Sequence, residues 1–323
     1  MRNFNNKMIS KTTPKLLPCG QTKINPQHHT QEQDKVFNDA KEHSTSQSVS
    51  LSLQQRGLMM FQEGQLTDCE FQLNEDDSFD ESEYTNIRAH KVILVYASDV
   101  FRSMFLGQFP NEDVVVIKDV KPKIFKHLLR FSYTSDIAEE EISFEELLEL
   151  AVSANKYLML NLQKICIDLA RKKLTPIKVF AAEYVAELLD EKKLLEDCLR
   201  VIKTSAASAL LSKCFLGITK PRLLTLLDSE KLNISSEMTL INACMRWAQC
   251  NHPDGVNAVM RSFLPKLRLL SLTSHEFSAN IETFSWLTDS EKVAVFVNIT
   301  SKRDAKIEIP SEFCKEENKR EAY

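Results

Sequence analysis

The chain has 323 residues, of which 43% are hydrophobic and 27% are charged, and its formal net charge is −4. At roughly 100–200 residues per domain this length suggests two domains, and the near-neutral balance argues against a dedicated nucleic-acid binder, which normally carries a strongly basic face. No apolar run approaches the ~20 residues of a membrane span, and the N-terminus lacks the apolar core of a secretory signal.

Residues 1–48 are predicted to form a disordered polar tail. Only 12 of the first 50 residues are hydrophobic, and such a segment cannot bury enough apolar surface to offset the entropy of ordering. Its histidines, His28, His29 and His43, could bind a metal, but a solvated tail is the favoured interpretation. The following stretch, SLSLQQRGLMMFQEGQL, has partly helical apolar spacing and predicts a short amphipathic helix or an extended arm that reaches a partner.

A small mixed sheet with flanking helices is predicted next. LTDCEFQL alternates with Cys69, Phe71 and Leu73 on one face, and VVVIKDV is a β-branched strand. Between them, NEDDSFDESEYTN reads as a solvated hairpin loop, and IRAHKVILVYAS turns from strand into helix. Ser98 is a candidate cap for the helix DVFRSMFL, and Pro122 fits the first turn of the helix KPKIFKHLLRFSY.

From residue 143 onward the pattern has helical period. FEELLELAVSANKYLML predicts one helix with Leu158 on the same apolar face as Leu147 and Ala154. A break follows at Thr175-Pro176, since a proline disfavours helix at the residue before it. Further helices are predicted to about residue 300, and the charged residues 301–323 are predicted to be a flexible tail.

The cysteines indicate the compartment. Eight occur, none in a C-x-x-C pair, and most lie within apolar helical patterns such as LQKICIDLA. This usage predicts buried free thiols in a reducing environment, the cytoplasm or the nucleus. We expect no cofactor and no metal.

Candidate catalytic and zinc-binding groups lack the context that such chemistry needs. Cys69 and His90 could form a thiolate–imidazole pair, but no local catalytic signature surrounds either residue. The C-x5-C-x-H spacing of Cys244, Cys250 and His252 matches no common structural zinc site. The sequence therefore predicts a protein that is not an enzyme and works through its surfaces.

An ordered series of short motifs resembles a BTB (POZ) domain followed by a BACK domain, closest to the BTBD-type BTB–BACK proteins. The BTB motifs are Leu66-Thr67-Asp68-Cys69-Glu70-Phe71, Ala89-His90-Lys91-Val92-Ile93-Leu94, Ser98-Asp99-Val100-Phe101 and Phe131-Ser132-Tyr133-Thr134. The BACK motifs are Leu223-Leu224 with Leu226-Leu227, and Met245-Arg246-Trp247-Ala248. The resemblance implies an α+β BTB/POZ domain, a small mixed sheet flanked by helices, over 49–170, and an all-α BACK domain over 171–300.

Five motif residues are expected to be structural: Asp68, His90, Lys91, Ser98 and Phe101. Asp68 at a strand start can accept backbone N–H bonds, and His90 can satisfy buried carbonyls at the strand-to-helix corner. Leu94, Met104 and Phe105 belong to an apolar stripe whose first interpretation is core.

The resemblance implies a homodimer through the BTB domain, with the leading helix near 50–64 in the interface. The interface residues expected there are Leu51, Leu58, Met59, Phe61 and Leu66. Heterodimers with related BTB proteins are the alternative.

The resemblance also implies that the surface after the helix ending near Phe105 receives the N-terminal domain of cullin-3. The residues expected to bind it are Met104, Phe105, Phe109, Asn111, Glu112 and Tyr133. Cullin-binding members carry a hydrophobic-x-Glu motif there, and in this chain Asn111 stands where the glutamate is expected, unless the register slips to Glu112. The first BACK helix pair, near 175–205, would supply an additional cullin contact.

These implications give two hypotheses for function. The first is a dimeric adaptor that links an unidentified protein substrate to a cullin-3 RING ubiquitin ligase, in the ubiquitin-like conjugation pathway. The alternative is a non-ligase interaction scaffold, or a dominant-negative protein that forms hybrid dimers. We expect no kelch propeller and no PHR domain after the BACK domain. Either the chain is a truncated isoform or fragment, or partners are recruited through the BACK domain, the C-terminal tail or residues 1–50.

Overall fold

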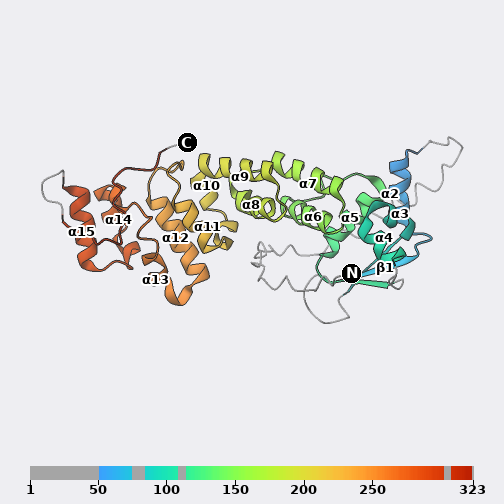
Figure 1. The fold of residues 1–323 in the computed structure, drawn as a ribbon, viewed down its shortest axis with the longest axis horizontal. Helices are drawn as coiled ribbons and strands as arrows, with labels where there is room; N and C mark the ends of the chain where they lie inside the picture. The colour runs from blue at the N-terminus through green and yellow to red at the C-terminus, as the bar shows by residue number, and fades with distance from the viewer. Residues whose placement is uncertain (1–50, 75–83, 108–113, 302–306, 322–323) are drawn as a thin grey trace, which may run out of the picture.

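The computed structural model describes residues 51–74, 84–107, 114–301 and 307–321. The protein is elongated, with a small sheet at one end, the helix α15 (Asp289–Thr300) at the other, and a C-terminal segment that returns toward the middle (Figure 1). The predicted disordered tail lies outside the described residues, and so does most of the predicted acidic loop.

In the part of the chain that the structure describes, the sheet has three strands in the order β2-β1-β3, with the central strand made of Cys69–Leu73. This strand, β1, pairs antiparallel with β2 (Thr85–Ala89) and parallel with β3 (Val114–Ile117). Phe71 is opposite Ile87 on one side and Val115 on the other. Cys69, Phe71 and Leu73 are all buried, which confirms the predicted face, because alternate residues of a strand point to the same side.

Among the described residues, six α-helices accompany the sheet: α2 (Leu53–Glu63), α3 (Lys91–Ala97), α4 (Asp99–Leu106), α5 (Pro122–Thr134), α6 (Phe144–Lys156) and α7 (Leu160–Lys172). The Ser98 side chain accepts hydrogen bonds from the N–H groups of Val100 and Phe101, and Pro122 occupies the first turn of α5. Both local predictions are confirmed. The core between sheet and helices is aromatic, with the Phe71 ring centroid 4.9 Å from that of Phe125.

The turn after α6 differs from the prediction. The helix ends at Lys156, and Leu158 adopts a left-handed conformation with φ +54° and points to solvent. The Met159 N–H bonds to the carbonyl of Ala154 across this turn, which is the 6→1 bond of a Schellman motif. Tyr157 takes the buried position instead, because the chain must reverse there to pack α7 on α6.

The second region is all helical, as predicted. Its α-helices, besides α15, are α8 (Val179–Leu188), α9 (Lys192–Thr204), α10 (Ala206–Leu210), α11 (Lys220–Leu227), α12 (Met238–Asn251), α13 (Val256–Arg261) and α14 (Ser274–Ala279). Short 3-10 turns join them: η2 (Pro176–Lys178), η3 (Cys214–Gly217), η4 (Pro253–Gly255), η5 (Leu269–Ser271) and η6 (Ile281–Phe284). Because α8 packs on α6 and α9 on α7, one hydrophobic core runs through both regions. Across the described ranges, every helix falls short of the length and apolar character that a bilayer crossing needs.

The C-terminal segment differs from the flexible tail that we predicted for 301–323. Residues 307–321 lie along the helical region, with the Phe313 ring and the Arg320 side chain buried. Sequence pattern pointed to a tail because charged residues dominate this stretch. The structure holds it through one aromatic ring and one fully paired guanidinium, whose partners lie far away in the sequence.

Candidate protein-interaction surfaces

The corner where β2 meets α3 is held by polar side chains. The Asp68 carboxylate accepts the Lys91 backbone N–H at 2.7 Å. His90 Nε2 lies 2.7 Å from the Gln65 carbonyl oxygen, which can only accept, so this nitrogen is the donor. His90 Nδ1 then accepts the Tyr133 hydroxyl at 2.8 Å, and the same hydroxyl accepts the His90 N–H. Burial raises the pKa of Tyr133 to about 12, so it remains a donor at neutral pH.

The leading helix α2 packs on α5 and leaves an apolar edge exposed. A Ser52–Gln55 capping box starts it and Gly64, with φ +58°, ends it. Gly57 sits so close to the Tyr133 carbonyl that a side chain there would collide with the backbone. Of the predicted dimer residues, Leu51, Leu58 and Phe61 are half-buried, whereas Met59 and Leu66 are exposed.

A second exposed edge lies on α3, which also packs on α5. Val92 and Tyr96 are exposed, while Leu94 and Val95 of the same helix are buried. The Arg102 guanidinium lies 5.7 Å from the Tyr96 ring centroid. Sequence reasoning missed Val92 and Tyr96, although their i, i+4 spacing puts them on one helix face opposite the buried pair. Helices α2 and α3 lie at the same end of the molecule (Figure 1).

The residues expected to bind a cullin are not all at the surface. Phe105 is 7% exposed with its ring 6.2 Å from that of Phe71, and Tyr133 is 9% exposed. The strand β1 and the helix α2 cover these two side chains, so neither presents a surface to a partner, and Met104 is half-buried against the core. The other three, Phe109, Asn111 and Glu112, lie outside the described residues.

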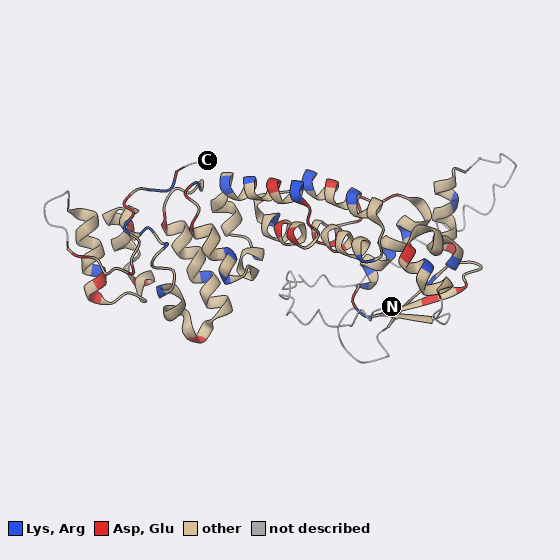
Figure 2. Ribbon diagram, viewed as in Figure 1, with Lys and Arg blue, Asp and Glu red and all other residues tan. Residues whose placement is uncertain are grey.

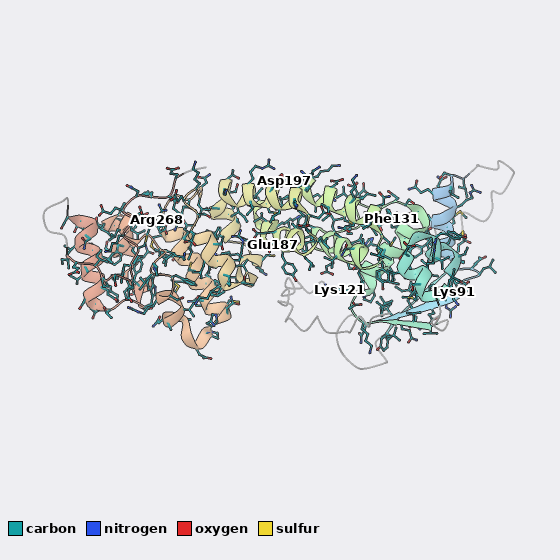
Figure 3. All side chains as sticks on the ribbon, in the orientation of Figure 1. Lys91, Lys121, Phe131, Glu187, Asp197 and Arg268 are labelled. Atoms are coloured by element: carbon teal, nitrogen blue, oxygen red, sulfur yellow. The ribbon has the colours of Figure 1, made fainter. Side chains whose placement is uncertain are left out.

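An apolar stripe runs from the 3-10 turn η2 along the outer side of α8. The stripe consists of Ile177 of η2, the half-buried Ala181, Tyr184 and Leu188, at the i, i+4, i+7, i+11 spacing of one helix face. Ile177 is 63%, Tyr184 40% and Leu188 54% exposed. Figure 3 shows Glu187 of α8 and Asp197 of α9 on opposite sides of this helix pair. Sequence reasoning marked residues 175–205 as a contact segment but did not identify these side chains.

A buried ion pair fixes which face of α8 turns outward. Glu183 lies on the inner face, and its carboxylate receives three hydrogen bonds from the Arg222 guanidinium of α11, at 2.6 to 3.2 Å. Burial raises the pKa of the Glu183 carboxyl, and Arg222 opposes that shift. Because the inner face of α8 is occupied by this ion pair and by apolar packing, the stripe lies on the outer face, where solvent or a partner can contact it.

Of the seven cysteines that the structure describes, four pack in the core, Cys214 and Cys314 are half-buried, and Cys250 is exposed. Cys69, Cys166, Cys198 and Cys244 are buried, and burial raises the pKa of both Cys166 and Cys198 to about 12. Such thiols are protonated at neutral pH and therefore poor nucleophiles. In the described parts of the chain, no three His, Cys, Asp or Glu residues are grouped so that they could hold a metal ion. Figure 2 shows acidic and basic residues interspersed along α7 and α9, whereas the charged residues of α8 are both acidic, Glu183 and Glu187.

Two family models match the chain in sequence. One describes the BTB/POZ domain and matches residues 58–174, and the other describes BACK, "BTB And C-terminal Kelch", and matches residues 179–282. Their junction falls between α7 and α8, at the Thr175-Pro176 break.

Curated relatives match both regions together. BTB/POZ domain-containing protein 6-A of Danio rerio is 29% identical over 79% of this chain and 47% of that protein. BTB/POZ domain-containing protein 6 of Homo sapiens is 25% identical over 80% and 48%. Kelch-like ECH-associated protein 1B of Danio rerio is 26% identical over 68% and 37%. The chain thus spans about half the length of the curated relatives it matches.

Proposed function

Since the chain belongs to the BTB–BACK family, we propose that it acts as a dimeric adaptor that links protein substrates to a cullin-3 RING ubiquitin ligase. An adaptor of this kind does no chemistry itself. It holds a substrate close to a ubiquitin-loaded enzyme, and the local concentration replaces a slow bimolecular encounter. A dimer doubles both binding sites, which raises effective concentration again.

The observation that carries the proposal is the apolar stripe on α8. It directly follows the BTB region and falls in the segment that the family resemblance assigns to cullin contact. A tyrosine flanked by two exposed aliphatic residues is also the composition of a protein-binding hot spot, in which aromatic side chains dominate the affinity.

The exposed edges of α2 and α3 support the dimer. Met59, Val92 and Tyr96 are apolar side chains on two helices that pack on the same third helix. We propose that these edges form the dimer interface together with Leu66. The half-buried Phe61 belongs to the packing of α2 on α5, since its ring lies 5.4 Å from that of Tyr133.

The experiment is a calorimetric titration of the full chain with the N-terminal domain of cullin-3, with the mass of the complex measured by light scattering. We expect one cullin domain per protomer of a dimer. Tyr184→Ala should weaken binding at least ~10-fold, as expected for a hot-spot aromatic residue. Leu211→Ala is the matched control, because Leu211 is an exposed apolar residue of the same region outside the stripe. Equal affinity of the two variants would count against the stripe.

The dimer is tested separately. Tyr96→Asp places a charge in the proposed interface and should give monomers by light scattering. Leu160→Asp, at an exposed position on α7, should leave the dimer intact. A dimer that survives Tyr96→Asp would exclude the α3 edge.

The loop after α4 is the remaining part of the proposed cullin site. We expect Phe109→Ala to weaken cullin binding and leave the dimer intact, because Phe109 is apolar in a polar stretch. Asn111 favours the second candidate, a dimerising scaffold or a hybrid-dimer partner that binds no cullin. A clean dimer without cullin binding in the titration would select that alternative, and Asn111→Glu would then be expected to restore binding.

A further inference from the structure

The C-terminal segment, residues 307–321, lies along the helical region in a non-helical conformation; we call it the strap. After α15 it runs back past α14 and α12 toward the middle of the molecule (Figure 1). Its backbone bonds to that of the helical region near the middle of the strap and at its far end. The Cys314 N–H donates to the Leu264 carbonyl, and at the far end Leu232 N–H donates to the Glu321 carbonyl and Glu321 N–H to that of Glu230.

Arg320 enters a site built for a guanidinium, which we call the arginine site. Its Nε and Nη2 donate to the two carboxylate oxygens of Glu237, both at 3.0 Å. The remaining N–H groups donate to the carbonyls of Leu227, Ser229 and Lys266, at 2.5 to 3.1 Å. All five guanidinium N–H groups are therefore used, and both charged side chains are 1% exposed. No other side chain would match this set of one carboxylate and three carbonyls.

The strap has the burial pattern of a bound linear peptide. Phe313 and Arg320 are its buried side chains, and the residues between them are exposed or half-buried. Next to Phe313, the Glu312 carboxylate accepts Arg261 Nη2 at 2.6 Å. Farther along, the Arg268 side chain donates to the Asn318 carbonyl, and Figure 3 shows Arg268 beside the returning strap. Backbone bonds with widely spaced anchor side chains are how extended peptides are recognised.

The buried pair of Glu237 and Arg320 is better suited to selecting one kind of peptide segment than to raising the stability of the fold. Burying two charges costs several kcal/mol of desolvation, and their attraction repays it only when geometry is excellent and every remaining hydrogen-bonding group is satisfied. The arginine site meets that condition for arginine alone. A lysine would supply three donors where five acceptor contacts exist, and a neutral residue would leave the Glu237 carboxylate buried without a counter-charge, with the Arg268 N–H as its remaining donor.

We propose that the surface under the strap is a peptide-binding site, filled in this chain by its own residues 312–321 as an internal ligand. Its ligand class is an extended segment with an aromatic residue and, seven positions later, an arginine followed by an acidic residue. This assignment names the substrate class of the adaptor, and for that biological role it rests on the proposed function. Substrates with the same pattern reach the site by displacing the strap.

The test uses the full chain with Phe313→Ala and Arg320→Ala, which frees the site, and a fluorescent synthetic peptide of residues 307–321. Fluorescence anisotropy should show the peptide bound to this variant at least ~10-fold more tightly than to the unaltered chain, whose site is occupied. A peptide with Arg320→Lys should lose at least ~10-fold in affinity. No binding to a variant that keeps its helical circular dichroism would overturn the proposal, and so would equal binding of the Lys peptide.

A second measurement covers the case in which the double variant unfolds. In hydrogen exchange on the unaltered chain, the amides of Cys314, Leu232 and Glu321 should exchange faster than those inside α12, because the strap opens without unfolding the helices. Equal rates would make the strap a permanent part of the fold and overturn the proposal. Cullin titration of the same samples keeps the two proposals separate, since strap substitutions should leave cullin affinity unchanged.

Discussion

Ion pairs mark a contrast between the region of the sheet and the helical region. Around the sheet they lie at the surface, as in Arg88–Glu70, where the arginine side chain is 72% exposed. In the helical region the pairs Glu183–Arg222 and Glu237–Arg320 are largely or wholly buried. The first region is held by an aromatic cluster and neutral hydrogen bonds. In the second region, arginine side chains join helices to one another and to the strap. The partners of these arginines are distant in the sequence.

The contrast has a physical cause. A strand pair brings backbone groups together in a ladder, so β1, β2 and β3 satisfy one another, and the polar side chains buried beside them, such as His90 and Ser98, pair without a buried ion pair. Short helices and 3-10 turns end in carbonyls that have no partner within the helix. Arg320 meets that need at Leu227, the last residue of α11, and at Ser229 just beyond it. A guanidinium with five donors is suited to such junctions.

The largest loss of stability is expected when the aromatic core of the sheet region is disrupted. Phe71→Ala removes a ring whose neighbours include Phe101, Phe105 and Phe125, and should lower the free energy of unfolding by about 4 kcal/mol. Urea-induced unfolding followed by circular dichroism measures it. Hydrogen exchange should place the loss in the sheet region, and a loss below about 1 kcal/mol would show that the cluster does not carry this region.

The next effect tests the buried pair. Glu237→Gln leaves the Arg320 guanidinium buried without a counter-charge and should cost about 3 kcal/mol. The control is the double variant Glu237→Met with Arg320→Met, which should recover most of the loss, because well-packed apolar replacements of a buried pair are often neutral. A double variant as unstable as the single one would mean that packing, and not charge, decides stability here.

The third prediction is that acid lowers the stability of the helical region. Hydrogen bonds from Arg261, the largest influence, lower the pKa of Glu291 from 4.5 to about 2. A carboxyl with a depressed pKa in the folded state adds stability above its unfolded pKa and loses it as pH falls toward the folded value. Stability should therefore fall by about 2 kcal/mol between pH 4.5 and pH 2 from this group alone. The Glu291→Gln variant should show a correspondingly smaller loss over that window, and an unchanged acid profile would contradict the assignment.

The smallest effect is expected for an exposed ion pair of the sheet region, Arg88 with Glu70. Arg88→Ala removes an exposed partner of Glu70 and should change stability by no more than about 0.5 kcal/mol. The same denaturation experiment measures it. A loss above 1 kcal/mol would show that the sheet region also depends on charge pairing.

Local features of the fold could be predicted from short stretches of sequence. The cap at Ser98, the first turn at Pro122 and the buried face of Cys69, Phe71 and Leu73 each depend on neighbours within a few residues. The family resemblance and the order of the two domains followed from motifs of the same length. Leu158 could not be predicted, because the helical period continues through it and only the packing of α7 on α6 ends the helix.

For the exposed surfaces, too, the sequence shows the spacing of the apolar residues and the tertiary structure decides whether they are buried. The stripe on α8 has a regular spacing in the sequence, but an apolar face of this kind is as often buried as exposed. Its exposure depends on the pair between Glu183 and Arg222, which are 39 positions apart. Phe105 and Tyr133 were expected at a partner surface, and the structure buries them because β1 and α2 cover them.

The sequence by itself determined the chain's elements, its two-domain order and its family, since periodicity, capping and short motifs act over a few residues. Only the tertiary structure decided which apolar faces remain exposed and where the C-terminal segment goes. Arg320 pairs with Glu237, which is 83 positions away in the sequence. No local pattern encodes that pairing, because burying a charge is favourable only where distant segments supply every hydrogen-bond partner at once.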